Sequence, residues 1–105
     1  MSLVVYWTTF AENKLTDIYH YYEIEAGIQV AQKLVDGIID ATIILENNPN
    51  IGQKEELLIN KPQDFRYLVF KNYKIVYWIN TTKNRIEIVH VFDCRQNPVK
   101  LKMTK

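Results

Sequence analysis

Six basic side chains fall in or beside the part of this sequence that has extended-strand patterning, and they are the residues best suited to chemistry. They are Lys54, Lys61, Arg66, Lys74, Arg85 and Arg95. A group of such cations can hold an RNA backbone and stabilise the charge of a phosphoryl-transfer transition state. Aromatic residues able to stack on bases lie among them: Tyr67, Tyr73, Tyr77, Trp78 and Phe92. The alternative is that the aromatic residues form a core and the cations a solvated face.

Arg66 and Arg95 differ from the other cations because each lies in or next to an apolar strand. A guanidinium in such a position needs a partner, which is either a carboxylate such as Asp93 or a phosphate brought by a target. A thiol enzyme is not expected, because Cys94 lies at a strand end without a positioned base. His90 is more typical of a sheet histidine whose hydrogen bonds are satisfied than of a catalyst.

The first half of the chain predicts one strand and two helices that could support this surface. Residues 3–8 are rich in β-branched and aromatic side chains, which favours a strand. Residues 9–12 have capping-box spacing, so a helix should begin at Thr9. Gly27 marks the break to a second helix over residues 28–46, which the Asn-Asn-Pro-Asn sequence at 47–50 ends. The pattern is typical of a two-helix hairpin.

From Phe65 onward the period changes from helical to extended. Three strands are predicted, over Phe65–Phe70, Tyr73–Ile79 and Ile86–Phe92, and their short connections favour an antiparallel meander. Residues 53–64 form a charged connector, and Pro98 ends the last strand before a basic tail. The element order βααβββ predicts an α+β fold, with the two-helix hairpin packed on a mostly antiparallel four-stranded sheet. Residues 1–105 form a single domain.

Composition excludes several classes of protein. Ordinary globular usage, with 48% hydrophobic and 24% charged residues, excludes disorder. The single cysteine cannot form an internal disulfide, and no cysteine or histidine spacing suggests a metal site. Three glycines are too few for a phosphate-binding or dinucleotide loop, so no cofactor is expected. No apolar run approaches the roughly 18 residues that cross a bilayer, and the default expectation is a cytoplasmic protein.

Charge is distributed unevenly along the chain. Residues 1–52 carry two lysines against seven acidic residues, whereas residues 53–105 carry eleven basic residues against five acidic ones. A basic working surface on the second half would face an anionic partner, although chance placement gives the same polarity. On the first helix, Tyr19, Tyr21 and Tyr22 cover much of the circumference, so some of them must be exposed. We expect Tyr19 and Tyr22 to contribute to a protein-contact surface.

Three motifs in the second half resemble those of the RelE/ParE superfamily, the toxins of type II toxin–antitoxin modules that include plasmid stabilisation proteins. They are Phe65-Arg-Tyr-Leu-Val-Phe, Asn72-Tyr-Lys-Ile-Val-Tyr and Ile86-Glu-Ile-Val-His-Val-Phe-Asp-Cys-Arg-Gln-Asn-Pro98. The resemblance covers essentially the whole chain. It implies a small cytoplasmic toxin that a cognate antitoxin holds inactive, and it suggests that the first strand pairs beside the last.

The superfamily divides by target. ParE-like members inhibit growth by poisoning DNA gyrase, and the near-neutral total charge favours that branch. RelE-like members are ribosome-dependent mRNA endoribonucleases (mRNA interferases). In that branch Arg66 and Arg95 match the arginines that grip the scissile phosphate, with Lys54 and Lys61 at the place of catalytic lysines. The tail after Arg95 lacks the Tyr or His used there for acid–base work. An inactive family member that only binds its antitoxin is a third alternative.

The predicted site therefore depends on the branch. The catalytic set, Arg66, Arg95, Lys54 and Lys61, applies only to a nuclease, which would use 2′-hydroxyl attack without a metal. Residues expected to contact a nucleic acid or another target are Lys74, Arg85, Tyr77 and Phe92.

Overall fold

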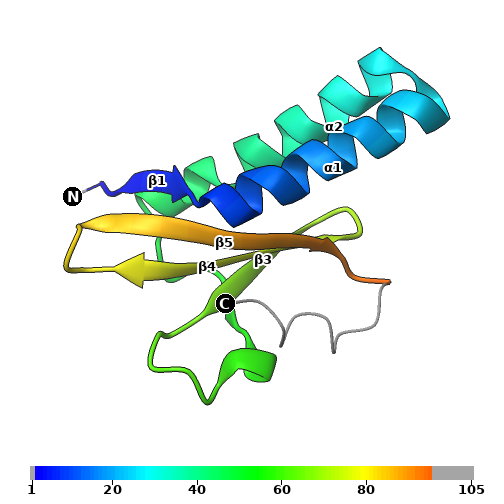
Figure 1. Cartoon of the computed structure of the whole chain (residues 1–105). Coiled ribbons are helices and arrows are strands. Elements are labelled where there is room, and N and C mark those ends of the chain that lie inside the picture. The colour runs from blue at the N-terminus through cyan, green and yellow to red at the C-terminus, as the bar shows by residue number, and fades with distance from the viewer. Residues whose placement is uncertain (1, 96–105) are drawn as a thin grey trace.

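Two helices pack on one face of a five-stranded sheet in the computed structural model, which describes residues 2–95 (Figure 1). The elements in chain order are β1 (Val4–Trp7), α1 (Thr9–Ala26), α2 (Ile28–Ala41), the 3-10 helix η1 (Ile43–Glu46), β2 (Gln53–Lys54), the 3-10 helix η2 (Glu56–Leu58), β3 (Arg66–Phe70), β4 (Tyr73–Asn80) and β5 (Arg85–Asp93). The sheet order is β1-β5-β4-β3-β2. This arrangement confirms the predicted α+β class and helical hairpin.

Helix α1 begins at Thr9, but its N-cap is Thr8 and not Thr9. The Thr8 hydroxyl accepts a hydrogen bond from the Ala11 N–H at 3.2 Å. The same hydroxyl and the Thr8 N–H both donate to the carbonyl oxygen of Ile88 in β5. Because Thr8 is anchored to the sheet, it takes the cap position, and the predicted capping box is one residue out of register.

Gly27 separates the two helices, as predicted. It has a φ of +99°, a backbone conformation that favours glycine, and its N–H donates to the carbonyl oxygens of Tyr22 and Glu23. Helix α2 ends at Ala41, and the chain continues as η1, so the predicted single helix over residues 28–46 is two helical segments. The apolar spacing nevertheless continues through both, and their fully buried residues are Ala31, Ile38, Thr42 and Leu45.

The sheet has five strands because part of the connector joins it. Gln53 and Lys54, which belong to the predicted charged connector, pair with Tyr67 and Arg66 at the outer edge of β3. At the other edge β1 lies parallel to β5, which confirms the pairing that the family resemblance suggested. The remaining pairs are antiparallel, and β3, β4 and β5 match the predicted strands to within one residue at each end.

The main core lies between the helices and the sheet. Its largest sheet residues are Tyr73, Ile75, Tyr77, Ile86, Ile88 and Val91. On the sheet face opposite the helices, Leu58 of the connector packs against Val76 and forms a smaller cluster. No helix within residues 2–95 is long and apolar enough to cross a membrane.

Candidate functional site

Arg66 anchors the loop that follows η1. Its guanidinium donates to the carbonyl oxygens of Gly52 at 2.9 Å and Asn50 at 3.3 Å, and it lies 3.2 Å from a carboxylate oxygen of Asp64. Only 18% of the side chain is exposed. In this conformation three groups of the protein itself occupy the guanidinium, so the arginine holds the loop and leaves little of its surface for a phosphate.

Tyr77, predicted to contact a target, is fully buried in the main core. Its hydroxyl donates to the carbonyl oxygen of Pro49 at 2.7 Å and accepts from the Gly52 N–H at 2.9 Å. A Cβ at Gly52 would lie 2.6 Å from that hydroxyl oxygen, so the contact requires glycine. The prediction that Tyr77 contacts a target is therefore wrong, because its ring lies on the face of β4 that the helices cover. Burial also raises the pKa of the Tyr77 hydroxyl.

The two connector lysines are more accessible. The Lys54 ammonium lies 3.7 Å from Asp64, with 67% of its side chain exposed. Asp64 therefore stands between Lys54 and Arg66, which are paired across β2 and β3. Lys61 is exposed on the turn after η2 and makes no ion pair with any residue in the described range.

Arg95 is paired with Asp93, one of the two kinds of partner predicted for it. Its guanidinium donates to both oxygens of Asp93, with distances from 2.6 to 3.2 Å, while 69% of its side chain is exposed. The hydrogen bonds from Arg95 hold the pKa of the Asp93 carboxyl well below its usual range. Residues 96–105, which include Pro98 and the basic tail, lie outside the described residues.

Arg66 of β3 and Arg95, which follows β5, bind different carboxylates, and these two strands are not neighbours. Arg66 is paired with Tyr77 of β4, whereas Asp93, the partner of Arg95, is paired with Tyr73. Four residues along a strand separate those positions by about 13 Å, and β4 itself lies between β3 and β5. In this conformation the two guanidinium groups bind Asp64 and Asp93 respectively.

The remaining predicted cations also have acidic partners. Lys74 lies 3.0 Å from the buried Glu55 and 4.1 Å from the centroid of the Tyr67 ring. Arg85 lies 2.8 Å from Glu87 and stacks at 3.8 Å on Tyr6. These contacts fix both cations on the sheet face opposite the helices. Phe92 is half-buried in the smaller cluster on that same face.

The tyrosines of α1 divide differently from the prediction. Tyr22 packs against the main core, and Tyr19 is half-buried. Tyr21 has 59% of its surface exposed and Ile24 has 82%, so these residues present the apolar surface near the end of the hairpin. The prediction of Tyr19 and Tyr22 as contact residues is therefore corrected for Tyr22, since the helix period alone does not show that Tyr21 is the exposed member of the group.

His90 lies in the sheet, as predicted, but it is buried with its Nδ1 unsatisfied among the described residues, and it stands between two aromatic rings. Its ring centroid is 5.1 Å from that of Phe10 and 5.2 Å from that of Phe92. Burial, together with the nearby Lys14 charge, lowers its pKa to about 4, so the ring is neutral at pH 7. Cys94 is exposed at the end of β5, where its N–H donates to the Asn72 carbonyl oxygen.

This burial predicts acid sensitivity. Because the folded pKa of His90 lies below the unfolded value of 6.5, the unfolded chain binds a proton first, and stability falls as the pH drops from about 6.5 to about 4. The full shift corresponds to about 3 kcal/mol, which is the upper limit of the expected loss. Urea unfolding at several pH values measures it. His90→Phe keeps the aromatic packing and should flatten this part of the profile, and an unchanged profile would refute the assignment.

Among residues 2–95, no group of three or more His, Cys, Asp and Glu side chains is placed to hold a metal ion. Each ionic contact described above joins one cation to one carboxylate. The exception is Asp64, which lies near both Lys54 and Arg66. The candidate surface is therefore an array of mostly paired charges and half-buried aromatic rings.

Comparison with known proteins identifies the family. The model of the ParE toxin of the type II toxin–antitoxin system parDE matches residues 5–98, whereas no curated protein matches the chain. Among solved structures, a chain of the chromosomal ParDE system from P. aeruginosa has a TM-score of 0.72 and 21% identity, covering 88% of this chain and 96% of that one.

Two further structures share the fold. A chain of the RelBE2 toxin–antitoxin complex from Mycobacterium tuberculosis has a TM-score of 0.64 and 15% identity, covering 89% of this chain and 99% of that one. A mutant of the E. coli toxin RelE in the free state has a TM-score of 0.61 and 14% identity, covering 97% of this chain and 94% of that one. The family match extends over nearly the whole chain, and this protein belongs to the ParE toxin family of type II toxin–antitoxin systems.

Proposed function

We propose that this toxin inhibits growth by binding an essential protein target, DNA gyrase, and that a cognate antitoxin neutralises it by binding the toxin directly. It acts in the cytoplasm, where gyrase is found, and such a module stabilises the plasmid or chromosomal segment that carries it. The membership of the ParE family supports this choice of branch.

The observation that carries the proposal is the state of the predicted catalytic cations. Arg66 is bound to two backbone carbonyls and Asp64, and Arg95 is bound to Asp93, the last residue of β5. A nuclease needs several unpaired donors around one phosphate, together with a base for the 2′-hydroxyl proton. Lys61 is exposed and makes no described ion pair, but one lysine does not supply that constellation. Binding a protein target requires neither these unpaired donors nor a base.

The test is induction of the toxin without its antitoxin in growing cells. Plasmid supercoiling, covalent gyrase–DNA complexes and mRNA 5′ ends are followed in the same culture. We expect growth to stop with trapped gyrase–DNA breaks while mRNA stays intact. Codon-phased mRNA cuts with normal supercoiling would replace the proposal with a RelE-like endoribonuclease. Continued growth with neither signal would favour an inactive member that only binds antitoxin.

A further inference from the structure

The sheet face opposite the helices has an exposed part where β1 lies beside the start of β5 and the end of β4. The smaller cluster covers this face around Val76. Farther along β4, Trp78 is paired with Glu87 of β5, which is paired in turn with Tyr6 of β1. Residues paired across strands point to the same side of a sheet, and Trp78 alternates with the helix-facing Tyr77. This cross-strand row therefore lies on the face away from the helices.

Aromatic and apolar side chains surround the row, and two of them are largely exposed. Val4, two residues before Tyr6 on the same face, has 68% of its surface exposed, and Tyr6 has 40%. Trp78 is half-buried, and its ring meets that of Phe65 edge-on, with 6.4 Å between the centroids. Side chains of this kind carry most of the binding energy where proteins associate. We call this set of residues the Tyr6 patch: Val4, Tyr6, Phe65, Trp78 and Arg85.

The charges within the Tyr6 patch are already paired. Arg85 lies at 3.8 Å over the ring of Tyr6 and at 2.8 Å from a carboxylate oxygen of Glu87. Asn80 donates a further hydrogen bond to the same oxygen at 3.1 Å. A partner that covers this ion pair does not leave either charge buried and unpaired. Because the guanidinium is held on the ring, little side-chain freedom is lost on binding.

The rim of the Tyr6 patch is positive. Val4 is paired with Arg85, so the turn that joins β4 to β5 adjoins the patch. Lys83 is exposed on this turn and makes no ion pair within residues 2–95. Residues 80–85 include no acid, and Glu87 is occupied by Arg85. The uncompensated charge here is therefore positive, which favours an acidic partner surface.

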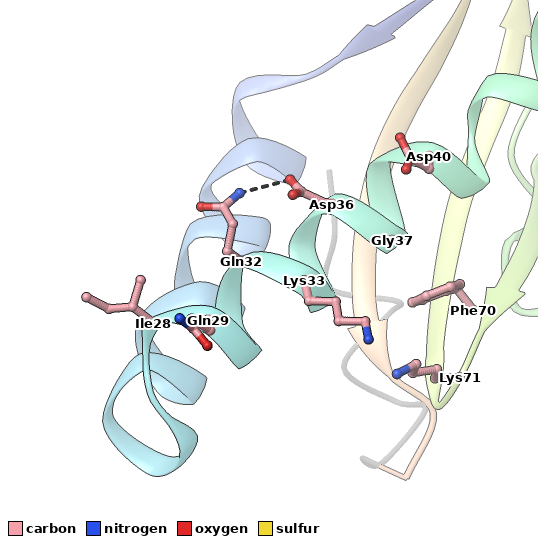
Figure 2. Close-up of a pocket in the computed structure, with 9 residues that line it drawn as sticks. All are labelled: Ile28, Gln29, Gln32, Lys33, Asp36, Gly37, Asp40, Phe70 and Lys71. Atoms are coloured by element: carbon pink, nitrogen blue, oxygen red, sulfur yellow. Dashed lines mark hydrogen bonds between the residues drawn. The ribbon is translucent and has the colours of Figure 1, made fainter.

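The groove between α2 and the β3–β4 turn differs in this respect (Figure 2). Its lining includes Lys33 and Lys71, but it also includes Asp36 and Asp40, so the charges balance. Charge selects no partner for the groove, whereas it does for the Tyr6 patch.

We propose that the Tyr6 patch is the surface with which the toxin binds its protein target, and that it docks on an acidic part of gyrase that presents an apolar side chain. The apolar side chain packs between Tyr6 and Trp78, and acidic groups around it face Lys83. The inference rests on the proposed function, which names gyrase, and adds where the toxin binds it. A nucleic acid fits less well, because phosphate binding needs several free cations and Arg85 is already paired.

The experiment measures the affinity of purified toxin variants for purified gyrase. Val4→Glu places an acid on the exposed patch, opposite an acidic partner, and should weaken binding by about tenfold or more. Ile28→Glu is the matched control, because Ile28 is also an exposed apolar residue, at 61% against 68%, but lines the groove beside α2. The control should change the affinity by less than about twofold. Urea unfolding shows whether each variant is folded.

Lys83→Glu is a second variant, which changes only the rim. Because Lys83 is exposed on a turn, this substitution leaves the packed residues in place. It should lower the association rate constant for gyrase by about threefold or more at low salt, and the difference should shrink as salt screens the charges. Binding of the same proteins to plasmid DNA alone is measured in parallel.

Failure of this inference and failure of the proposed function give different results. If the unaltered toxin does not bind gyrase, the proposed function fails, and the target surface falls with it. If the unaltered toxin binds but folded Val4→Glu and Lys83→Glu bind equally well, the Tyr6 patch is not the docking surface, although the proposed function stands. Equal weakening by Ile28→Glu would also overturn the inference. Binding to DNA alone that Val4→Glu abolishes would assign the patch to a nucleic acid instead.

Discussion

Replacing Tyr77 with alanine is expected to lower the free energy of unfolding by about 3–5 kcal/mol, the range for removing a large aromatic side chain from a packed core. The ring is fully buried, and its hydroxyl joins the carbonyl oxygen of Pro49 to the N–H of Gly52. The alanine variant loses both the packing and these two bonds. Urea or thermal unfolding of the purified protein measures the change.

Tyr77→Phe isolates the hydroxyl. It keeps the ring but leaves the Gly52 N–H without its partner, so we expect a loss of about 1–3 kcal/mol. The loop at 49–52 should also exchange its amide hydrogens faster in this variant. If Tyr77→Phe were as stable as the wild type, the hydroxyl contacts would contribute nothing, and the loop would be held by other groups.

Arg66→Ala and Arg95→Ala are expected to differ sharply. Arg66→Ala removes the donor to Gly52 and Asn50 and leaves Asp64 without its close guanidinium partner, so we expect it to cost about 2–4 kcal/mol. Arg95 is largely exposed, so Arg95→Ala should unfold at a denaturant concentration close to that of the wild type. Both variants are compared by urea unfolding under identical conditions.

The same pair bears on function. A protein-binding toxin does not need Arg95 for chemistry, so the stable Arg95→Ala protein should still arrest growth when it is produced without antitoxin. Complete loss of toxicity in a folded Arg95→Ala protein would return this arginine to a catalytic role. Equal stability of the two alanine variants would instead refute the structural role given to Arg66.

Local patterning predicted most of the fold. The helical spacing, Gly27 and the apolar runs from Phe65 onward were enough to place the hairpin and the three long strands. The two-residue strand β2 was missed because it exists only through its contact with β3, which no local preference encodes. Thr8 and Thr9 are equally good capping residues, and the choice depends on the anchoring of Thr8 to Ile88.

The candidate site was less predictable. The pairing of Arg95 with Asp93 was accessible because the two residues are close in sequence. The partners of Arg66 and Lys74 come from the connector and from the loop just before it, 2 to 19 positions away, and depend on how these segments fold back over the sheet. The sequence pattern places Tyr77 in a strand. Only the tertiary packing determines that its ring lies on the sheet face covered by the helices. Lys33 and Lys71 lie on a helix and a turn, and only the tertiary fold brings them to one groove.

We expect this ParE-family toxin to act on a protein and not on RNA. To test this, the purified toxin is incubated with gyrase, supercoiled plasmid and ATP, and in parallel with translating ribosomes on a defined mRNA. We predict cleaved plasmid that stays linked to gyrase after denaturation, and an intact mRNA on the ribosomes. Cleaved mRNA with untouched plasmid would contradict the account and restore the arginines to an active site.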